Sequence, residues 1–190
     1  KRGTITTDDG IIINADTFIF NKTNNVLNAK GNVKLENTIE KYSIFSQEVT
    51  YFKNDEKIFT KGKSKATDNK GQTIESDKFS FNNNTNILNA EGNVKVINKL
   101  ENYEIFAEKI TYFKNEEKIL TEGKTLAEIH TRYKIDSKDV IFLKNQNKLI
   151  SKNQTKINDQ DDQMYILDEF VFLLNESILK GKNILTITDY

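Results

Sequence analysis

A segment of eight residues that occurs twice constrains the fold of this chain more than any other feature. Asn28–Leu35 reads NAKGNVKL, and Asn89–Val96 reads NAEGNVKV. The flanking sequence repeats in the same register, so that Gly10–Phe20 matches Gly71–Phe81. A fixed period over this much of a 190-residue chain indicates a repeat architecture, in which each repeat packs against its neighbours.

A shorter period lies inside the long one. Gly31, Gly62, Gly92 and Gly123 follow one another at nearly equal intervals, which halve the spacing of the long repeat. Each glycine closes a half-repeat that consists of an alternating apolar and polar run, a polar turn and a second alternating run. Strict alternation predicts half-buried β-strands. The six half-repeats span approximately residues 11–36, 42–67, 72–97, 103–128, 133–158 and 163–188.

These patterns predict an all-β fold with about twelve strands, and more where bends divide a run. A phase shift between Ala15 and Phe18 predicts a bend or bulge that keeps both ends of the run on one face. The Asn-rich segment Asn21–Asn25 and the pair Asp9-Gly10 predict turns. No linker interrupts the pattern, so we expect a single domain over residues 1–190.

Composition excludes several function classes. The 28 basic and 28 acidic residues balance, whereas a chain that neutralises a phosphate backbone usually has a basic excess. The chain has no cysteine, so it forms no disulfide and supports no thiol chemistry. No apolar run reaches the roughly 18 residues that a membrane helix needs. The chain starts at Lys1 and not at Met, as expected for a processed or excised piece.

Signals of catalysis are weak, and we expect no enzyme activity, no cofactor and no metal. His130 is the only histidine, and no serine or carboxylate is spaced to form a triad with it. Asp159–Asp162 lacks the loop length, glycine and distal glutamate of a calcium-binding loop, so a solvated turn is expected there.

The inward face of the predicted strands is the main candidate for function. Small residues, such as Ala29 and Ala90, lie among larger apolar ones, which fits either a close-packed sandwich core or a groove. The even half-repeats carry a second apolar set on the opposite face, which fits packing against a neighbouring segment or a partner surface. This second set is Phe45, Phe52, Phe59, Phe106, Phe113 and Leu120.

The repeated pattern of Ala15–Lys34, and less strictly of Ser76–Lys95, resembles the OstA-like domains of lipopolysaccharide export. This family includes a periplasmic bridge protein, its inner-membrane-anchored companion and the N-terminal domain of the outer-membrane assembly protein of Gram-negative bacteria. The resemblance covers residues 11–188 approximately. Asn153, which stands where the fifth half-repeat should have glycine, departs from the pattern.

The resemblance implies a twisted, V-shaped β-jelly roll that is open along one side. Such a protein is periplasmic, is attached to the outer membrane in one family member, and carries the acyl chains of lipid A without catalysis. The implied partners are lipopolysaccharide, other OstA-like jelly rolls that join by edge-strand addition, and a C-terminal outer-membrane barrel after Tyr190 with its lipoprotein plug. The implied groove residues are Phe18, Phe20, Leu27, Val33, Leu35, Phe79, Phe81, Leu88, Val94 and Val96, together with Ile44, Val49, Ile58, Ile105, Ile110 and Ile119.

An open jelly roll leaves unpaired strand edges, which invite strand addition. We expect these edges near Thr4–Ile13 and Ile184–Thr188. The alternative is a structural β-solenoid or adhesin-type array that binds protein or glycan. A solenoid would fill its inward face and would repeat evenly, without the difference between odd and even half-repeats.

Overall fold

The computed structural model describes residues 2–188, and its regular structure is almost entirely β-strand. These residues form eighteen strands and two short 3₁₀ turns, Lys53–Asp55 and Lys144–Gln146, which confirms the predicted all-β class. The strands outnumber the expected twelve because the bends divide several runs. Contacts within the chain group it into two compact units, Lys1–Gly92 and Asn93–Tyr190. The expectation of one domain stays a prediction, and each unit is described by itself.

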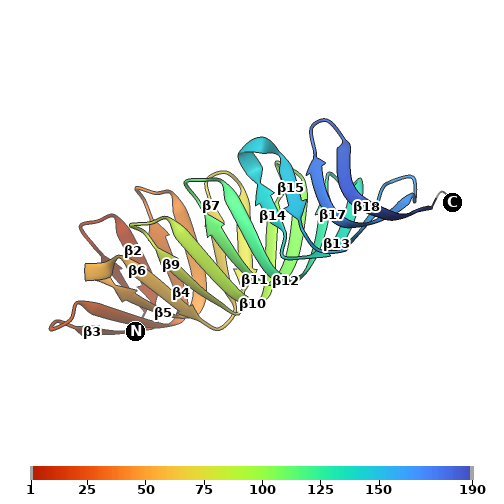
Figure 1. Ribbon diagram of the computed structural model, residues 1–190. Helices are drawn as coiled ribbons and strands as arrows, with labels where there is room; N and C mark the ends of the chain where they lie inside the picture. The colour runs from red at the N-terminus through yellow and green to blue at the C-terminus, as the bar shows by residue number, and fades with distance from the viewer. Residues whose placement is uncertain (1, 189–190) are drawn as a thin grey trace. The chain divides into compact units, whose positions relative to one another are not determined.

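The first unit contains nine strands and the start of a tenth, joined in hairpins that follow one another along the chain (Figure 1). These strands are β1 (Gly3–Thr6), β2 (Ile11–Ala15), β3 (Thr17–Asn21), β4 (Val26–Asn37), β5 (Tyr42–Phe52), β6 (Lys57–Lys61), β7 (Ser64–Asp68), β8 (Gln72–Ser76), β9 (Lys78–Asn82) and the first part of β10 (Ile87–Asn98).

The second unit continues the same plan. It contains the rest of β10 and the strands β11 (Tyr103–Phe113), β12 (Lys118–Ile129), β13 (Tyr133–Lys138), β14 (Ile141–Leu143), β15 (Lys148–Ser151), β16 (Thr155–Asn158), β17 (Met164–Leu173) and β18 (Ile178–Thr188).

Two facing sheets build the first unit, and the long strands β4 and β5 take part in both. One sheet pairs β1, β2, the end of β4, the start of β5, β7 and β8. The other pairs β3, the start of β4, the end of β5, β6, β9 and β10. All of these pairings are antiparallel. A β-helical solenoid stacks its coils as parallel strands, so the solenoid alternative does not fit this topology.

The bend that lets β4 serve two sheets lies at Gly31, opposite Asp16. The backbone of Gly31 has φ +77°, and that of Asn32 has φ 47°. The side-chain Nδ2 of Asn32 donates to Oδ2 of Asp16 at 2.8 Å, and the Asp16 N–H donates to the Gly31 carbonyl at 3.0 Å. This confirms the bend predicted between Ala15 and Phe18. The register of β4 against β5 shifts by one residue here, and the buried positions of β5 change their alternation between Ser46 and Val49.

Polar side chains form the bend of the fifth half-repeat, which lacks the glycine. There the strand is interrupted between β15 and β16. The Asn153 side chain donates from Nδ2 to the Lys138 carbonyl at 3.2 Å, and the Ser151 hydroxyl donates to the same carbonyl at 2.7 Å. The departure from the repeat pattern therefore changes how the bend is held and does not remove it.

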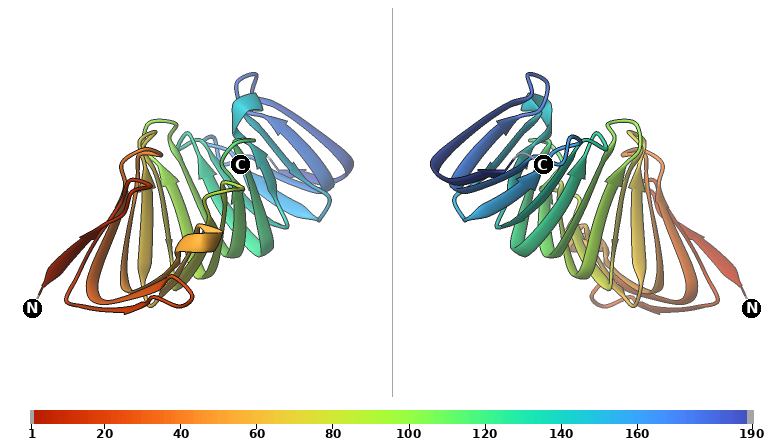
Figure 2. Two further views of the ribbon diagram at one scale, coloured as in Figure 1. Left: turned by 90° about the vertical axis from the view of Figure 1, so that its left-hand side faces the viewer. Right: turned by 90° about the vertical axis from the view of Figure 1, so that its right-hand side faces the viewer.

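The expected first edge strand is divided in two. Residues Thr4–Ile13 include β1, a turn at Asp8–Gly10 and the start of β2. The strand β2 pairs with β1 on one side and with β4 on the other, so Ile12 lies inside a sheet. Of these two strands only β1 lies at an edge, where Figure 2 shows it leading from the N-terminus.

Substitution of Gly31 by alanine tests the bend. An added Cβ would lie 3.0 Å from Cβ and Cγ of Asp16, and closer still to its Oδ2. Gly123 has a similar φ of +78°, but its added Cβ would approach only Oε2 of Glu108, at 3.6 Å. We expect Gly123→Ala to cost about 1–2 kcal/mol, because a left-handed backbone disfavours a Cβ. Gly31→Ala should cost clearly more in urea unfolding, and equal losses would contradict this account.

Candidate functional site

The predicted groove residues lie on the inward faces of the sheets, and all but two are buried. The exceptions are Phe18, which is half-buried, and Phe20, which is 50% exposed. The first unit brings together Phe18, Phe20, Leu27, Val33, Leu35, Ile44, Val49, Ile58, Phe79, Phe81 and Leu88. The second unit brings together Val94, Val96, Ile105, Ile110 and Ile119.

Phe18 and Phe20 expose an apolar surface on the inward face of the first unit. Phe20 lies opposite Leu27, and Phe18 lies opposite Ala29, which places both rings on the same face as buried side chains. The corresponding residues of the third half-repeat, Phe79 and Phe81, are only 3% and 6% exposed. The sequence pattern is the same in both half-repeats. The difference in exposed fraction therefore comes from the segments that cover the rings. An apolar surface left open on an inward face is suited to an apolar ligand.

Polar contacts at the strand ends of the first unit connect its two sheets. Tyr51, near the end of β5, donates from its hydroxyl to the Asp9 carboxylate in the turn between β1 and β2. Lys53 binds the neighbouring Asp8, with 2.6 Å between Nζ and Oδ1. Both contacts lie far from the bends along the strands, and they tie the turn of one sheet to the strand end of the other.

These contacts shift the pKa values of the groups involved. Burial acts to raise the pKa of Asp9, but hydrogen bonds from Thr7 and Tyr51 outweigh it and hold the pKa below the ordinary value. Burial, together with the hydrogen bond to Asp9, raises the pKa of Tyr51 well above its ordinary value. Tyr51 is therefore a neutral donor, and Asp9 an ionised acceptor, at neutral pH.

Buried hydroxyl groups lie near several bends, and sequence reasoning missed them. The Ser46 and Ser64 hydroxyls are 3.0 Å apart, and Ser64 donates to Thr60 at 2.7 Å. In the second unit, the Thr121 and Thr125 hydroxyls are 2.6 Å apart. A signal was present in the repeat, because alanine and valine occupy the matching positions of the first half-repeat.

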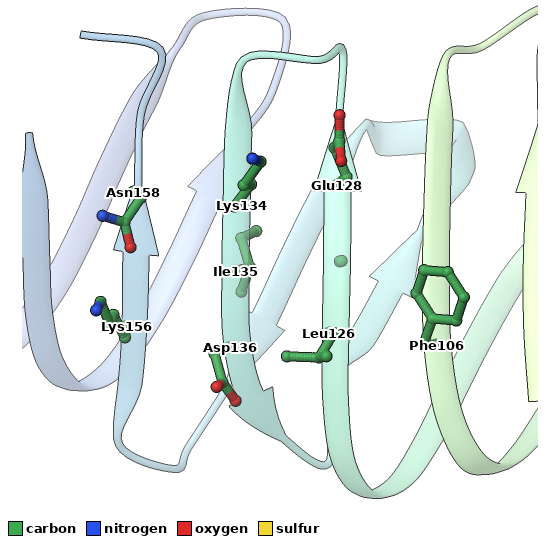
Figure 3. Close-up of a pocket in the computed structure, with 9 residues that line it drawn as sticks. Phe106, Leu126, Glu128, Lys134, Ile135, Asp136, Lys156 and Asn158 are labelled. Atoms are coloured by element: carbon green, nitrogen blue, oxygen red, sulfur yellow. The ribbon is translucent and has the colours of Figure 1, made fainter. Parts of the chain in front are cut away.

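The second apolar set lies on the outer faces of the sheets. Phe45 and Phe106 are 45% and 42% exposed, and lysine side chains lie 5.7 and 5.0 Å from their ring centres. Phe106 and Leu126, which pair across β11 and β12, border a shallow pocket of about 320 Å³ (Figure 3). Its other lining includes Lys134 and Asp136. Opposite charges alternate around this pocket, so it shows no preference for one sign of ligand charge.

No group of metal-binding side chains and no helix able to cross a membrane occurs in the part of the chain that the structure describes. His130 has a left-handed backbone with φ 53°, and its N–H donates to the Asn102 carbonyl at 2.7 Å. Asp159 accepts hydrogen bonds from the backbone N–H groups of Asp161 and Gln163, as in an ordinary Asx turn.

Comparison with known proteins shows the fold. No protein-family model matches the sequence, and no curated protein matches it. Among solved structures, the chain is similar to LptH of Pseudomonas aeruginosa, the LptA-homologous periplasmic component of a lipopolysaccharide transport device. The TM-score is 0.54 at 16% identity, over 61% of this chain and 86% of that chain. The predicted all-β jelly roll of the OstA-like type is thus confirmed as a fold.

A second solved structure is the TCP10 domain of Danio rerio CPAP in complex with a STIL peptide. Its TM-score is 0.21 at 11% identity, with both chains covered fully. A score this low does not indicate a shared fold.

The different environments of Phe20 and Phe81 predict different costs of truncation. Phe81→Ala removes a buried ring and should cost about 3–5 kcal/mol of the free energy of unfolding. Phe20→Ala removes a half-exposed ring and should cost about 1 kcal/mol or less. Urea unfolding of the two variants measures both values. Similar costs would mean that Phe20 is covered in solution.

The Asp9 pair predicts a loss of stability in acid. A carboxylate with a lowered folded pKa stabilises the fold above its unfolded pKa, and this stabilisation is lost as the pH falls through the folded pKa. Tyr51→Phe removes one donor, so the pKa of Asp9 should rise. The variant should then lose less unfolding free energy than the parent between about pH 6 and about pH 3. Equal losses in urea unfolding would show that Tyr51 does not act on Asp9.

Proposed function

We propose that this chain is a non-catalytic carrier of lipopolysaccharide that holds the acyl chains of lipid A against its inward faces. The observation that carries the proposal is the exposed inward surface of Phe18 and Phe20, on a fold shared with a periplasmic component of lipopolysaccharide transport. Because a fold does not fix a function, this local surface is what supports the proposal beyond the likeness of fold.

The chemistry of the inward faces suits acyl chains. The side chains of the groove residues are aliphatic or aromatic, and each buried methylene of a ligand contributes about 0.8 kcal/mol. The sugars of a lipopolysaccharide are polar and gain nothing from this environment, so they stay in water. Several bound acyl chains would be held firmly, and the driving force for passage must therefore come from a partner.

We also propose that the carrier works in the periplasm and joins other OstA-like jelly rolls through its edge strands. The strand β1 supplies one such edge, and we place the other at β18. The bridge protein and the N-terminal domain of the outer-membrane assembly protein are alternative family members for this chain. In the second case, an outer-membrane barrel and its lipoprotein plug would be further partners.

Photo-crosslinking at two neighbouring residues tests the proposal. A benzophenone amino acid at Phe20 faces inward, and the same probe at Ile19 faces outward. Ile19 is 66% exposed, so it is more accessible than Phe20. With purified lipopolysaccharide we expect adducts at position 20 and few at position 19.

Two results would contradict the proposal. Equal adducts at both positions would indicate adsorption to any exposed apolar side chain. Adducts at position 20 that persist with lipopolysaccharide stripped of its acyl chains would indicate binding through the sugars.

A further inference from the structure

The interior of the first unit is filled by its own side chains. Ile13, Leu35, Ile44 and Ile58 are each 0–1% exposed, so not even water reaches them. An acyl chain is wider than a water molecule. If the inward face is to hold one beyond the exposed ring of Phe20, the two sheets must first move apart.

The two sheets of the first unit are held differently at their two sides. On the bend side, β4 and β5 run continuously from one sheet into the other. On the opposite side, side chains make the connection. Tyr42 packs edge-to-face on Phe81, with 5.1 Å between ring centres, and its hydroxyl donates to Oδ1 of Asn83 at 2.7 Å.

The pairing pattern shows that these contacts cross between sheets. Tyr42 lies opposite Asn37 and Asp68 within its own sheet. Phe81 lies opposite Ile58 and Leu88 in the other sheet. We call the row of such cross-sheet contacts at the strand ends the seam. In the first unit the seam includes Tyr42 with Phe81 and Asn83, and Tyr51 with Asp9.

The second unit has a seam of the same construction. Tyr103 packs edge-to-face on Phe142 at 5.1 Å, and Tyr133 packs edge-to-face on Phe172 at 4.6 Å. In all three pairs the phenylalanine follows its tyrosine at the same spacing along the chain. The repeat thus places a tyrosine at the end of one sheet and a phenylalanine at the facing end of the other.

We propose that the seam is a lateral gate, through which each unit admits acyl chains when its two sheets part about the bends. This inference rests on the proposed function. Backbone pairing runs within each sheet, so the seam, which side chains hold, can open without disturbing that pairing. Entry from the side also allows the polar head of an amphiphile to stay in water while its chains enter.

A reversible crosslink across the seam tests the gate. The chain has no cysteine, so Tyr42→Cys with Asn83→Cys provides the only thiols, and neither residue belongs to the groove set. A short bis-maleimide with a cleavable centre joins the thiols. The readout is the amount of fluorescently labelled lipopolysaccharide that co-elutes with the protein. We expect at least about a tenfold drop with the linker intact, and recovery after cleavage.

A matched pair of cysteines within one sheet is the control. Thr67 and Thr73 lie opposite each other on β7 and β8, with hydroxyls 3.3 Å apart. The same linker at Thr67→Cys with Thr73→Cys should leave lipopolysaccharide binding unchanged. Equal binding by the linked and cleaved seam variants would overturn the gate and leave the proposed function intact. A parent protein that binds no lipopolysaccharide would overturn the proposed function and the gate with it.

A second variant tests the gate without cysteines. Tyr42→Phe keeps the ring and removes the hydrogen bond to Asn83, so the seam should open more often. We expect faster association of labelled lipopolysaccharide in stopped-flow fluorescence, with an unchanged rate for the outer-face variant Thr67→Val. An unchanged or slower rate for Tyr42→Phe would overturn the gate.

Discussion

The bend at Gly31 is the constraint on which the first unit depends. The buried residues of β4 keep one alternation through this point, since Leu27 and Ala29 before the bend and Val33 and Leu35 after it are all buried. Two consecutive residues with positive φ, Gly31 and Asn32, turn the strand there. The Asp16 carboxylate accepts the hydrogen bond that fixes this geometry. One strand therefore contributes an inward face to two sheets, and a core forms between them.

The bend of the second half-repeat carries buried hydroxyl groups that the bend of the first half-repeat lacks. Where the first half-repeat has Ala29 and Val33, the second has Thr60 and Ser64. Their hydroxyls bind one another, and Thr60 also accepts the backbone N–H of Phe79 at 2.8 Å. A buried hydroxyl without a partner would be costly, so these residues occur where the bend leaves backbone groups to be satisfied. The fifth half-repeat has a similar pair, since the Ser137 and Thr155 hydroxyls are 2.6 Å apart.

The sequence was sufficient for the strands and for the inward face, because both depend on local alternation and on the repeat. The exposure of Phe20 could not be predicted in this way. Its pattern is identical to that of Phe81, yet its exposure depends on which segments cover it in three dimensions. The pairing of Tyr42 with Phe81 was equally hidden, because the two residues are far apart in the chain and lie in different sheets. The single edge strand expected over Thr4–Ile13 was wrong because the Asp9-Gly10 turn divides it.

The hairpin order of the strands has an evolutionary consequence. Within the first unit, β5 takes its partners from the strands just before and just after it in the chain, β4 on one side and β6 and β7 on the other. A duplicated copy of the long repeat would bring its own partners with it and would meet unchanged neighbours at both junctions. The chain can therefore lengthen by tandem duplication without any change in the residues at its two ends. Its length can evolve in steps of one repeat.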